Sequence, residues 1–424
     1  MNGGPGADSG SGLFPASGFR AARGGRRRAA APRPPAPSPN DALDGGCPLF
    51  IVHKPHTYHG LVPELLARLQ SDTAGNLALG VSSWLPSYDP GDHQEFNSSC
   101  TAAEVRIVDP RAYIADKPLV RVKKPADGHA GRAPYLCGED FPVSALLDAQ
   151  RECGANLLLT SGRALDPKDS LKSLAAAVAD GDEALSLLKA GERLALNLTL
   201  GPDWLRDPDL RDDLLAELIE MRQFGIWYVR VQWPSTAKSW HQPHDKNLLD
   251  GYKELAATAR DQGRRLLLPQ TGLTGWLALA WGAAGYGTGT SGTGQAFLRE
   301  SDGGGGGNGT SPVERYFEKQ LLHFAERTAH PVLERDPAYV KCTCPYCPSL
   351  LATEPWSALD AGHHYLHTAG MLTAEVAPAG TGSSKIRSAV ADKVRDAITF
   401  AADKRLTGHS IPGHLGAWDL ALSS

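Results

Sequence analysis

The sequence predicts an α/β protein built on a (β/α)8 TIM-like barrel, with a C-terminal zinc-binding subdomain and a disordered N-terminal tail. In the middle of the chain, short and continuously apolar runs alternate with longer runs of helical periodicity. That alternation is typical of a parallel sheet whose two faces are both covered by helices. Near the C-terminus, three cysteines lie within six residues and are followed by three histidines, which indicates a metal site.

The predicted strands are short runs rich in Leu, Ile and Val. They cover residues 105–109 (VRIVD), 156–160 (NLLLT), 193–199 (RLALNLT), 226–232 (IWYVRVQ) and 264–270 (RRLLLPQ). Helical spacing fills the intervals, at residues 141–152, 169–190, 209–223 and 248–262. These are five strand–helix units, and residues 276–287 contain signals of a sixth. Because a barrel needs eight units, an open doubly wound sheet is the alternative architecture.

Composition sets the limits on domains and compartment. The chain has 424 residues, of which 42% are hydrophobic and 21% charged, and its net charge is −4. Such a charge balance does not attract the whole molecule to nucleic acid or to an anionic membrane. No apolar run approaches the roughly 18 residues of a membrane span, and the scattered Cys47, Cys100, Cys137 and Cys153 fit a reducing compartment. We therefore expect a cytoplasmic protein without a membrane partner.

Three regions follow from these patterns. Residues 1–45 are rich in Gly, Pro, Ala and Arg and poor in large apolar side chains, so we expect a disordered tail. Their Arg-rich composition is also typical of organelle transit peptides. Residues 46–330 form the predicted barrel, with a Gly-rich loop at 299–311, and residues 331–424 form the predicted zinc-binding subdomain.

In either architecture, chemistry belongs at the carboxyl ends of the parallel strands. The candidates there are Asp109 as a catalytic residue, and Asn197, Arg230, Gln232 and Gln270 as substrate-binding residues. Arg230 and Gln232 share one side of their strand, and polar inward side chains are costly to bury without partners, which favours a pocket. Two plainer interpretations stay open: Arg230 pairs with a nearby acid, and Asp109 caps the turn that follows it.

The second glycine-rich region, residues 282–294, has two interpretations. Its glycines let backbone amides approach a ligand closely and form an anion-binding nest. It lacks the lysine of a phosphate-binding loop and the spacing of a dinucleotide fingerprint. A surface loop is the other interpretation.

The clearest motif is Cys342-Thr-Cys344-Pro-Tyr-Cys347, followed by His363, His364 and His367. Thiolate and neutral imidazole are ligands that Zn²⁺ prefers, and a Cys3His set completes a tetrahedron. Because no coordination position stays open for water or substrate, the sequence predicts a structural zinc ion. The residues leave open which histidine is the fourth ligand.

Residues 331–347, which end in the cysteine triplet, together with the histidines after them, resemble the metal-binding end of the tRNA-guanine transglycosylase family. A weaker similarity lies at residues 154–162 (GANLLLTSG). Those enzymes carry a CxCxxC triplet and a downstream histidine that opens a helix, late in a (β/α)8 barrel. The resemblance therefore implies zinc at Cys342, Cys344, Cys347 and His363, the first histidine of the pair.

The resemblance also implies a function: base exchange (pentosyl transfer) on a guanine, in tRNA, in DNA or in a nucleoside. A purine base, a nucleic acid and a homo- or hetero-oligomeric partner are the implied partners. The family uses one aspartate as nucleophile and a second near a Ser-Gly-Gly turn. Here residues 196–199 read Leu-Asn-Leu-Thr, with no acid, and no strand-end aspartate stands at the nucleophile's place.

The alternative is a non-catalytic, zinc-stapled barrel that binds nucleic acid or a partner subunit. Phosphate binding normally needs a basic face. The C-terminal region offers basic residues close along the chain, namely Lys385, Arg387, Lys393, Arg395, Lys404 and Arg405. Acids alternate with them, as on an ordinary solvated helix face.

Overall fold

The structure is a computed structural model. It describes residues 39–55, 59–85, 90–114, 142–233, 242–290, 292–297, 314–379 and 384–424. The predicted loop at 299–311 and residues 1–38 of the predicted tail lie outside this set. Pro37–Ser424 forms one compact unit, and the boundary predicted at residue 330 falls inside it.

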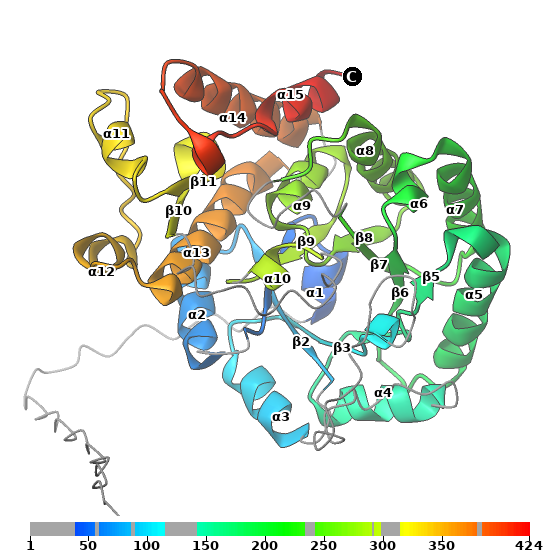
Figure 1. Cartoon of the computed structure of the whole chain (residues 1–424). Helices are drawn as coiled ribbons and strands as arrows, with labels where there is room; N and C mark the ends of the chain where they lie inside the picture. The colour runs from blue at the N-terminus through cyan, green and yellow to red at the C-terminus, as the bar shows by residue number, and fades with distance from the viewer. Residues whose placement is uncertain are drawn as a thin grey trace, which may run out of the picture. The chain divides into compact units, whose positions relative to one another are not determined.

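A parallel sheet forms the centre of this unit (Figure 1). Its eight-strand path is β3 (Val105–Asp109), β2 (Ala78–Trp84), β1 (Leu49–His53), β9 (Gly285–Thr288), β8 (Arg265–Leu268), β7 (Ile226–Val231), β6 (Leu194–Leu200) and β4 (Leu158–Leu159). The short β5 (Ala164–Leu165) pairs with β6 beside that path. The predicted α/β class and parallel sheet are thus confirmed, as an eight-strand half-barrel with a Cys3His cluster near the C-terminus.

The two end strands of the path, β3 and β4, approach each other. One isolated parallel bridge joins Ile107 to Leu157. Next to it, the Asn156 side chain accepts a hydrogen bond from the Arg106 amide at 2.7 Å and donates one to the Glu104 carbonyl at 2.8 Å. Among the described residues, Ile107 and Leu157 are the one pair that β3 and the β4 segment form as parallel strands. The paired strands therefore make a half-barrel and not a fully closed barrel.

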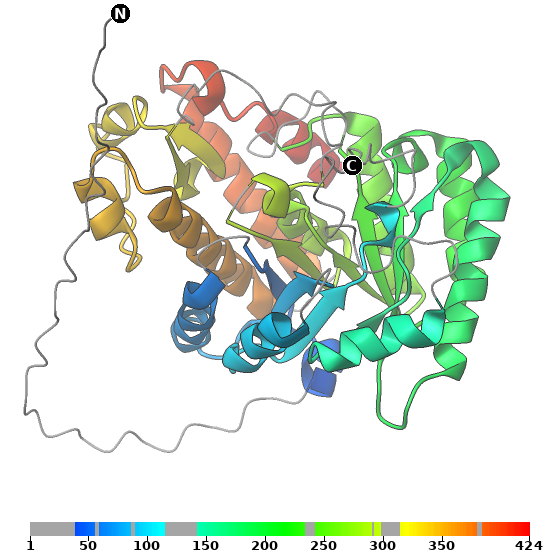
Figure 2. The ribbon, with the colours of Figure 1, turned by 60° about the horizontal axis from the view of Figure 1, so that its bottom comes forward.

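Helices cover the outer side of the sheet, as Figures 1 and 2 show. They are α2 (Val62–Asp72), α3 (Pro90–Ser99), α4 (Val143–Glu152), α5 (Ser170–Ser186), α6 (Asp203–Arg206), α7 (Pro208–Glu220), α8 (Lys246–Asp261), α9 (Gly272–Ala278) and α13 (Ala358–Val376). Local sequence explains where they begin: Asp207 and Asp245 cap α7 and α8 by accepting hydrogen bonds from the first backbone amides. Among the described residues, no helix combines the length and the apolar composition needed to span a bilayer.

The core has two apolar layers. Inside the sheet, side chains such as Ile51, Ile107 and Leu267 pack on one another. Outside it, the alternate residues of the same strands pack against the apolar faces of the helices. Strand residues buried on both faces read as continuous apolar runs, which is why the sequence revealed most of them.

Three details differ from the sequence predictions. Residues 39–44 of the predicted tail form the helix α1 (Pro39–Asp44), because Leu43 is buried and Asp44 pairs with Arg193 at 2.8 Å. In the central sheet, β1, β2 and the short β5 were not predicted. The glycine-rich residues 282–294 are neither nest nor surface loop at their centre, since Gly285–Thr288 is the fully buried strand β9.

The C-terminal elements separate the last strand of the sheet from its helix. Between β9 and α13 lie α10 (Gly292–Gln295), the hairpin of β10 (Arg315–Glu318) and β11 (His323–Glu326), α11 (His330–Glu334) and α12 (Cys347–Ala352). After α13 come α14 (Ser384–Ala402) and α15 (Leu415–Ser423). The helix α13 therefore contacts both the sheet and the segment that carries the cysteines.

Candidate metal centre and strand-end site

The three thiols and one imidazole converge as a metal site requires. The ligand atoms of Cys342, Cys344, Cys347 and His364 all lie within 4.8 Å of one another. Nδ1 of His364 lies 3.2, 3.3 and 3.9 Å from the sulfurs of Cys344, Cys347 and Cys342. With Zn–S near 2.3 Å and Zn–N near 2.0 Å, a tetrahedron has edges of roughly 3.5–3.8 Å. The cluster therefore has the size and the chemistry of a structural Zn²⁺ site.

The histidine that lies with the three thiols is His364 and not the predicted His363. Successive residues on a helix point about 100° apart, so only one of the pair faces the thiols. His363 instead stacks on Tyr346, with ring centroids 5.5 Å apart, and its Nε2 is buried without a hydrogen bond. Burial lowers its pKa. One turn later, His367 pairs with Asp72 of α2 at 3.0 Å.

Neighbouring groups orient the His364 ring. Its Nε2 donates a hydrogen bond to the Phe317 carbonyl at 2.7 Å, which leaves the Nδ1 lone pair for a metal. Tyr316 stacks on the ring at 4.3 Å and its hydroxyl lies 3.3 Å from the Cys347 sulfur. Burial alone lowers the pKa of His364, but hydrogen bonds to Cys342 and Cys344 and the charge of Cys344 raise it to about 10. A bound cation takes the place of that proton.

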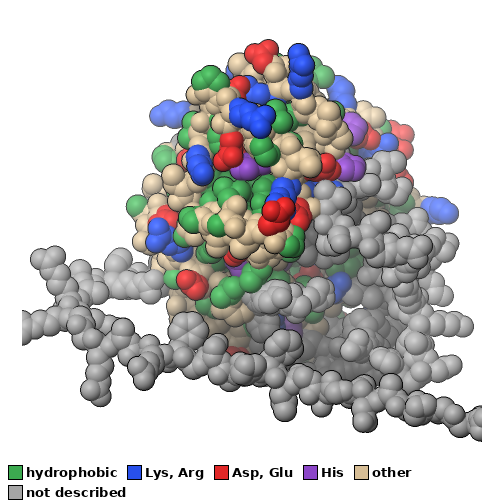
Figure 3. Space-filling view, turned by 60° about the vertical axis from the view of Figure 1, so that its left-hand side comes forward, with side chains coloured by type: hydrophobic (Ala, Val, Ile, Leu, Met, Phe, Trp, Pro, Cys, Tyr) green, Lys and Arg blue, Asp and Glu red, His purple; other side chains and the backbone are tan. Residues whose placement is uncertain are grey.

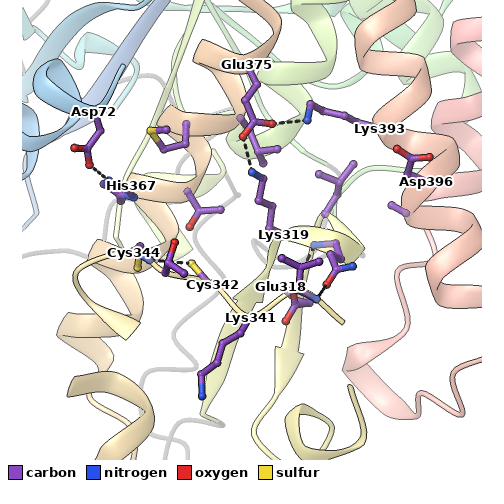
Figure 4. Close-up of a pocket in the computed structure, with 18 of the residues that line it drawn as sticks. Asp72, Glu318, Lys319, Lys341, Cys342, Cys344, His367, Glu375, Lys393 and Asp396 are labelled. Atoms are coloured by element: carbon purple, nitrogen blue, oxygen red, sulfur yellow. Dashed lines mark hydrogen bonds and ion pairs between the residues drawn. The ribbon is translucent and has the colours of Figure 1, made fainter. Parts of the chain in front are cut away.

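A groove of about 800 Å³ opens onto two of the thiols, Cys342 and Cys344 (Figure 4). In its upper part Glu375 of α13 pairs with both Lys319 and Lys393. Below them lies the buried Glu318, whose pKa burial raises to about 7. Cys342 is half-buried whereas Cys344 is only 6% exposed, so the groove makes Cys342 the most accessible ligand.

At the carboxyl ends of the strands, three of the predicted residues meet. Arg230 of β7 is 0% exposed and forms an ion pair with Asp109 of β3. Its Nε donates to Oε1 of Gln270 at 2.9 Å and its Nη1 donates to Thr199 at 3.1 Å. Burial lowers the pKa of Arg230, but the Asp109 carboxylate together with Tyr113 and Tyr228 raises it, so the net shift is upward. The interpretation that Arg230 pairs with a nearby acid is confirmed.

Aromatic rings and a tight turn complete this strand-end cluster. The Arg230 guanidinium lies 4.6 Å from the ring centroid of Tyr113, which packs edge-on against Phe297. The second oxygen of Asp109 accepts a hydrogen bond from the Arg111 amide at 3.0 Å, so Asp109 also caps its turn, as the plainer interpretation expected. Arg111 and Gln270 both have left-handed backbones, with φ of 56° and 54°. Strained non-glycine residues of this kind gather at functional sites.

The other two predicted residues have separate partners. The Asn197 amide nitrogen and side chain bond to Thr160 of the neighbouring strand segment, at 2.9 and 3.3 Å. Its Oδ1 is buried without a hydrogen bond, and the residue lines a cavity of about 250 Å³ that faces α5. Gln232 is 4% exposed, and its backbone amide donates to Leu200 at 2.8 Å.

His53, the last residue of β1, belongs to the strand-end cluster and was missed. Its Nε2 accepts a hydrogen bond from the Gln270 amide at 3.1 Å. Burial, and secondly the charge of Arg230, lower its pKa to about 3, so the ring is neutral near pH 7. The signal was present, since His53 ends the apolar run Leu49–His53. Tyr113 follows β3 in a short 3-10 turn, and no sequence pattern marks it.

The basic residues of the C-terminal helices are largely paired. Lys393 pairs with Glu375, Arg395 with Asp419 and Lys404 with Asp336. Arg387 donates to the Leu422 carbonyl. On the face of the molecule that carries the metal-binding segment, basic and acidic side chains are interspersed (Figure 3). Acidic side chains and a backbone carbonyl thus engage these four basic side chains.

Comparison with known proteins adds no relative. The chain matches no protein-family model and no curated protein.

Proposed function

We propose that this protein exchanges a purine base in a nucleic acid, as tRNA-guanine transglycosylases do, and that the exchange takes place at the strand-end cluster. The observation that carries the proposal is the convergence of Asp109, Arg230 and Gln270 at the carboxyl ends of β3, β7 and β8. In parallel α/β folds this end of the sheet holds the active site. The left-handed backbones of Arg111 and Gln270 add to it.

The proposal includes a closed (β/α)8 barrel. The bridge between Ile107 and Leu157 and the Asn156 side chain join the two end strands of the eight-strand path. If these strands pair throughout, all eight carboxyl ends face one opening. Full pairing would extend the contact between β3 and β4 along both strands and complete a pocket around Asp109.

In the proposed reaction the C1′–N9 bond of the outgoing purine breaks and a C1′–N9 bond to the incoming purine forms. One proton moves from N9 of the free incoming base to N9 of the outgoing base. Asp109 is the proposed carrier of this proton, because it is a carboxylate at a strand end. The Cys3His centre takes no part in the chemistry, since four protein ligands leave Zn²⁺ no open position.

A second candidate is a barrel that binds a purine without exchanging it. Among the last residues of the eight strands, only Asp109 is an acid, and both of its oxygens are already engaged, by Arg230 and by the Arg111 amide. Base exchange through a covalent intermediate needs a second carboxylate. This ion pair is the observation that favours binding alone.

Incubation with radiolabelled guanine and a nucleic acid distinguishes base exchange from binding alone. We expect the wild type to incorporate label into tRNA or into DNA, and Asp109→Asn to lose incorporation while it still binds guanine in equilibrium dialysis. Asp203→Asn is the matched control, because Asp203 is an exposed acid that follows β6. Guanine binding without incorporation would establish the second candidate. A wild type that neither binds guanine nor incorporates it would refute the proposal.

A further inference from the structure

Two hydroxyl pairs join α13 to β9, one at the last residue of the strand and one two residues earlier. The Tyr365 hydroxyl lies 2.9 Å from Oγ1 of Thr288, the last residue of β9. The Tyr286 hydroxyl lies 2.9 Å from Oγ1 of Thr373, two turns further along the helix. All four side chains are at most 1% exposed. The two pairs are equally buried, but they differ in their place on the strand, and Thr373 also donates a hydrogen bond to the Ala369 carbonyl at 2.8 Å.

The pair at Thr288 leads directly into the strand-end cluster. Its neighbour Gly287 has room for no side chain, because a Cβ there would lie 2.7 Å from Nε2 of His53. That same Nε2 accepts the hydrogen bond from the Gln270 amide, and the Gly287 carbonyl accepts one from Thr271 at 3.2 Å. Gln270 in turn holds Arg230. The position of β9 therefore sets the turn that carries Gln270.

Tyr365 is also linked to the metal centre. His364, the imidazole ligand, is the residue before Tyr365 on α13. The Tyr365 ring packs against Phe317 and Phe324 of the β10–β11 hairpin, with centroids 5.2 and 5.0 Å apart. The Phe317 carbonyl also accepts the hydrogen bond from His364. Holding His364 thus holds Tyr365 against the end of β9.

We infer that Tyr365 is a positioning residue, through which the metal-anchored first turns of α13 hold β9 and thereby the Gln270 turn of the strand-end cluster. Coupling between distant sites needs a contiguous chain of packed and bonded groups. Tyr365, Thr288, the adjacent Gly287, His53 and Gln270 form one. Removing the Tyr365 hydroxyl leaves that of Thr288 buried without its partner, so β9 is less firmly held at this end. Through Tyr365 the metal centre influences the strand-end cluster without contacting it.

The test compares Tyr365→Phe with Tyr286→Phe, since each removes one buried hydroxyl between α13 and β9. Hydrogen exchange is followed at the amides of Gln270 and Thr271, which bond to His53 and Gly287. We expect exchange there to be about tenfold faster in Tyr365→Phe and close to wild type in Tyr286→Phe, with similar melting temperatures for both. Thr288→Val should reproduce Tyr365→Phe, and the double variant should exchange no faster than either.

Equal exchange in the two tyrosine variants, or no change in Tyr365→Phe, would overturn the inference. A guanine-binding assay connects the inference to the proposed function. This assay depends on the proposed function, whereas the hydrogen-exchange measurement does not. We expect the dissociation constant to rise several-fold in Tyr365→Phe and not in Tyr286→Phe. If wild type does not bind guanine, the proposed function fails, while the exchange measurement still decides the role of Tyr365.

Discussion

Arg230 and Asp109 form an ion pair that joins the ends of β7 and β3 and is almost completely removed from water, with side chains 0% and 9% exposed. Removing one partner of such a pair leaves a buried charge without a counter-ion and lowers the free energy of unfolding by about 3–5 kcal/mol. An exposed ion pair contributes only about 0–1 kcal/mol. The strand-end cluster therefore depends on both partners for its stability.

We predict that Asp109→Ala lowers the free energy of unfolding by about 3–5 kcal/mol, measured by urea denaturation, because Arg230 loses its counter-ion. The double variant Asp109→Leu/Arg230→Met should recover much of that loss, since no charge stays buried. As control, Asp250→Ala breaks the exposed pair with Lys246 and should change stability by about 0.5 kcal/mol or less. Additive losses in the double variant would contradict the prediction.

The two adjacent histidines of α13 should behave oppositely in metal analysis. His364→Ala removes the only imidazole in the Cys3His cluster, so the purified protein should hold much less than one zinc per chain by atomic emission. His363→Ala removes a ring that stacks on Tyr346 and should retain stoichiometric zinc. Zinc retained by the first variant and lost by the second would reverse our assignment of the ligand.

The contact between the end strands can be tested at Asn156. Its side chain makes two hydrogen bonds to the β3 segment, at the Arg106 amide and the Glu104 carbonyl. We predict that Asn156→Ala lowers the free energy of unfolding by about 1–3 kcal/mol in urea titration, because both backbone groups lose a partner. The exposed Asn247→Ala on α8 should stay within about 0.5 kcal/mol of wild type. An equal effect of the two variants would count against a join between β3 and β4.

Stability should depend on pH through His53. Its pKa falls from 6.5 to about 3 on folding, so the unfolded chain binds the proton more readily and stability declines as pH drops below 6.5. Between pH 7 and pH 5 this contributes about 2 kcal/mol of loss. We predict that wild type loses about that much more than His53→Asn over this range, by chemical denaturation at each pH. Parallel pH profiles of the two proteins would be inconsistent with a buried neutral His53.

The chain pattern alone predicted most of the sheet, because strands covered on both faces are continuous apolar runs and need no tertiary information to be recognised. β6, β7 and β8 were located in this way. β2, Ala78–Trp84, has a mixed composition, and only its pairing with β1 and β3 makes it a strand. The thiol triplet was also evident locally, since Cys342, Cys344 and Cys347 are neighbours in the chain.

Tertiary structure decided the rest. Which histidine meets the thiols depends on the rotation of α13 about its axis, and that rotation is set by packing against β9 and the β10–β11 hairpin. Asp109 and Arg230 are 121 residues apart, and only the curvature of the sheet makes them partners. Local sequence carries residue type and periodicity, whereas the pairing of distant side chains follows from how the strands and helices pack, which no single segment encodes.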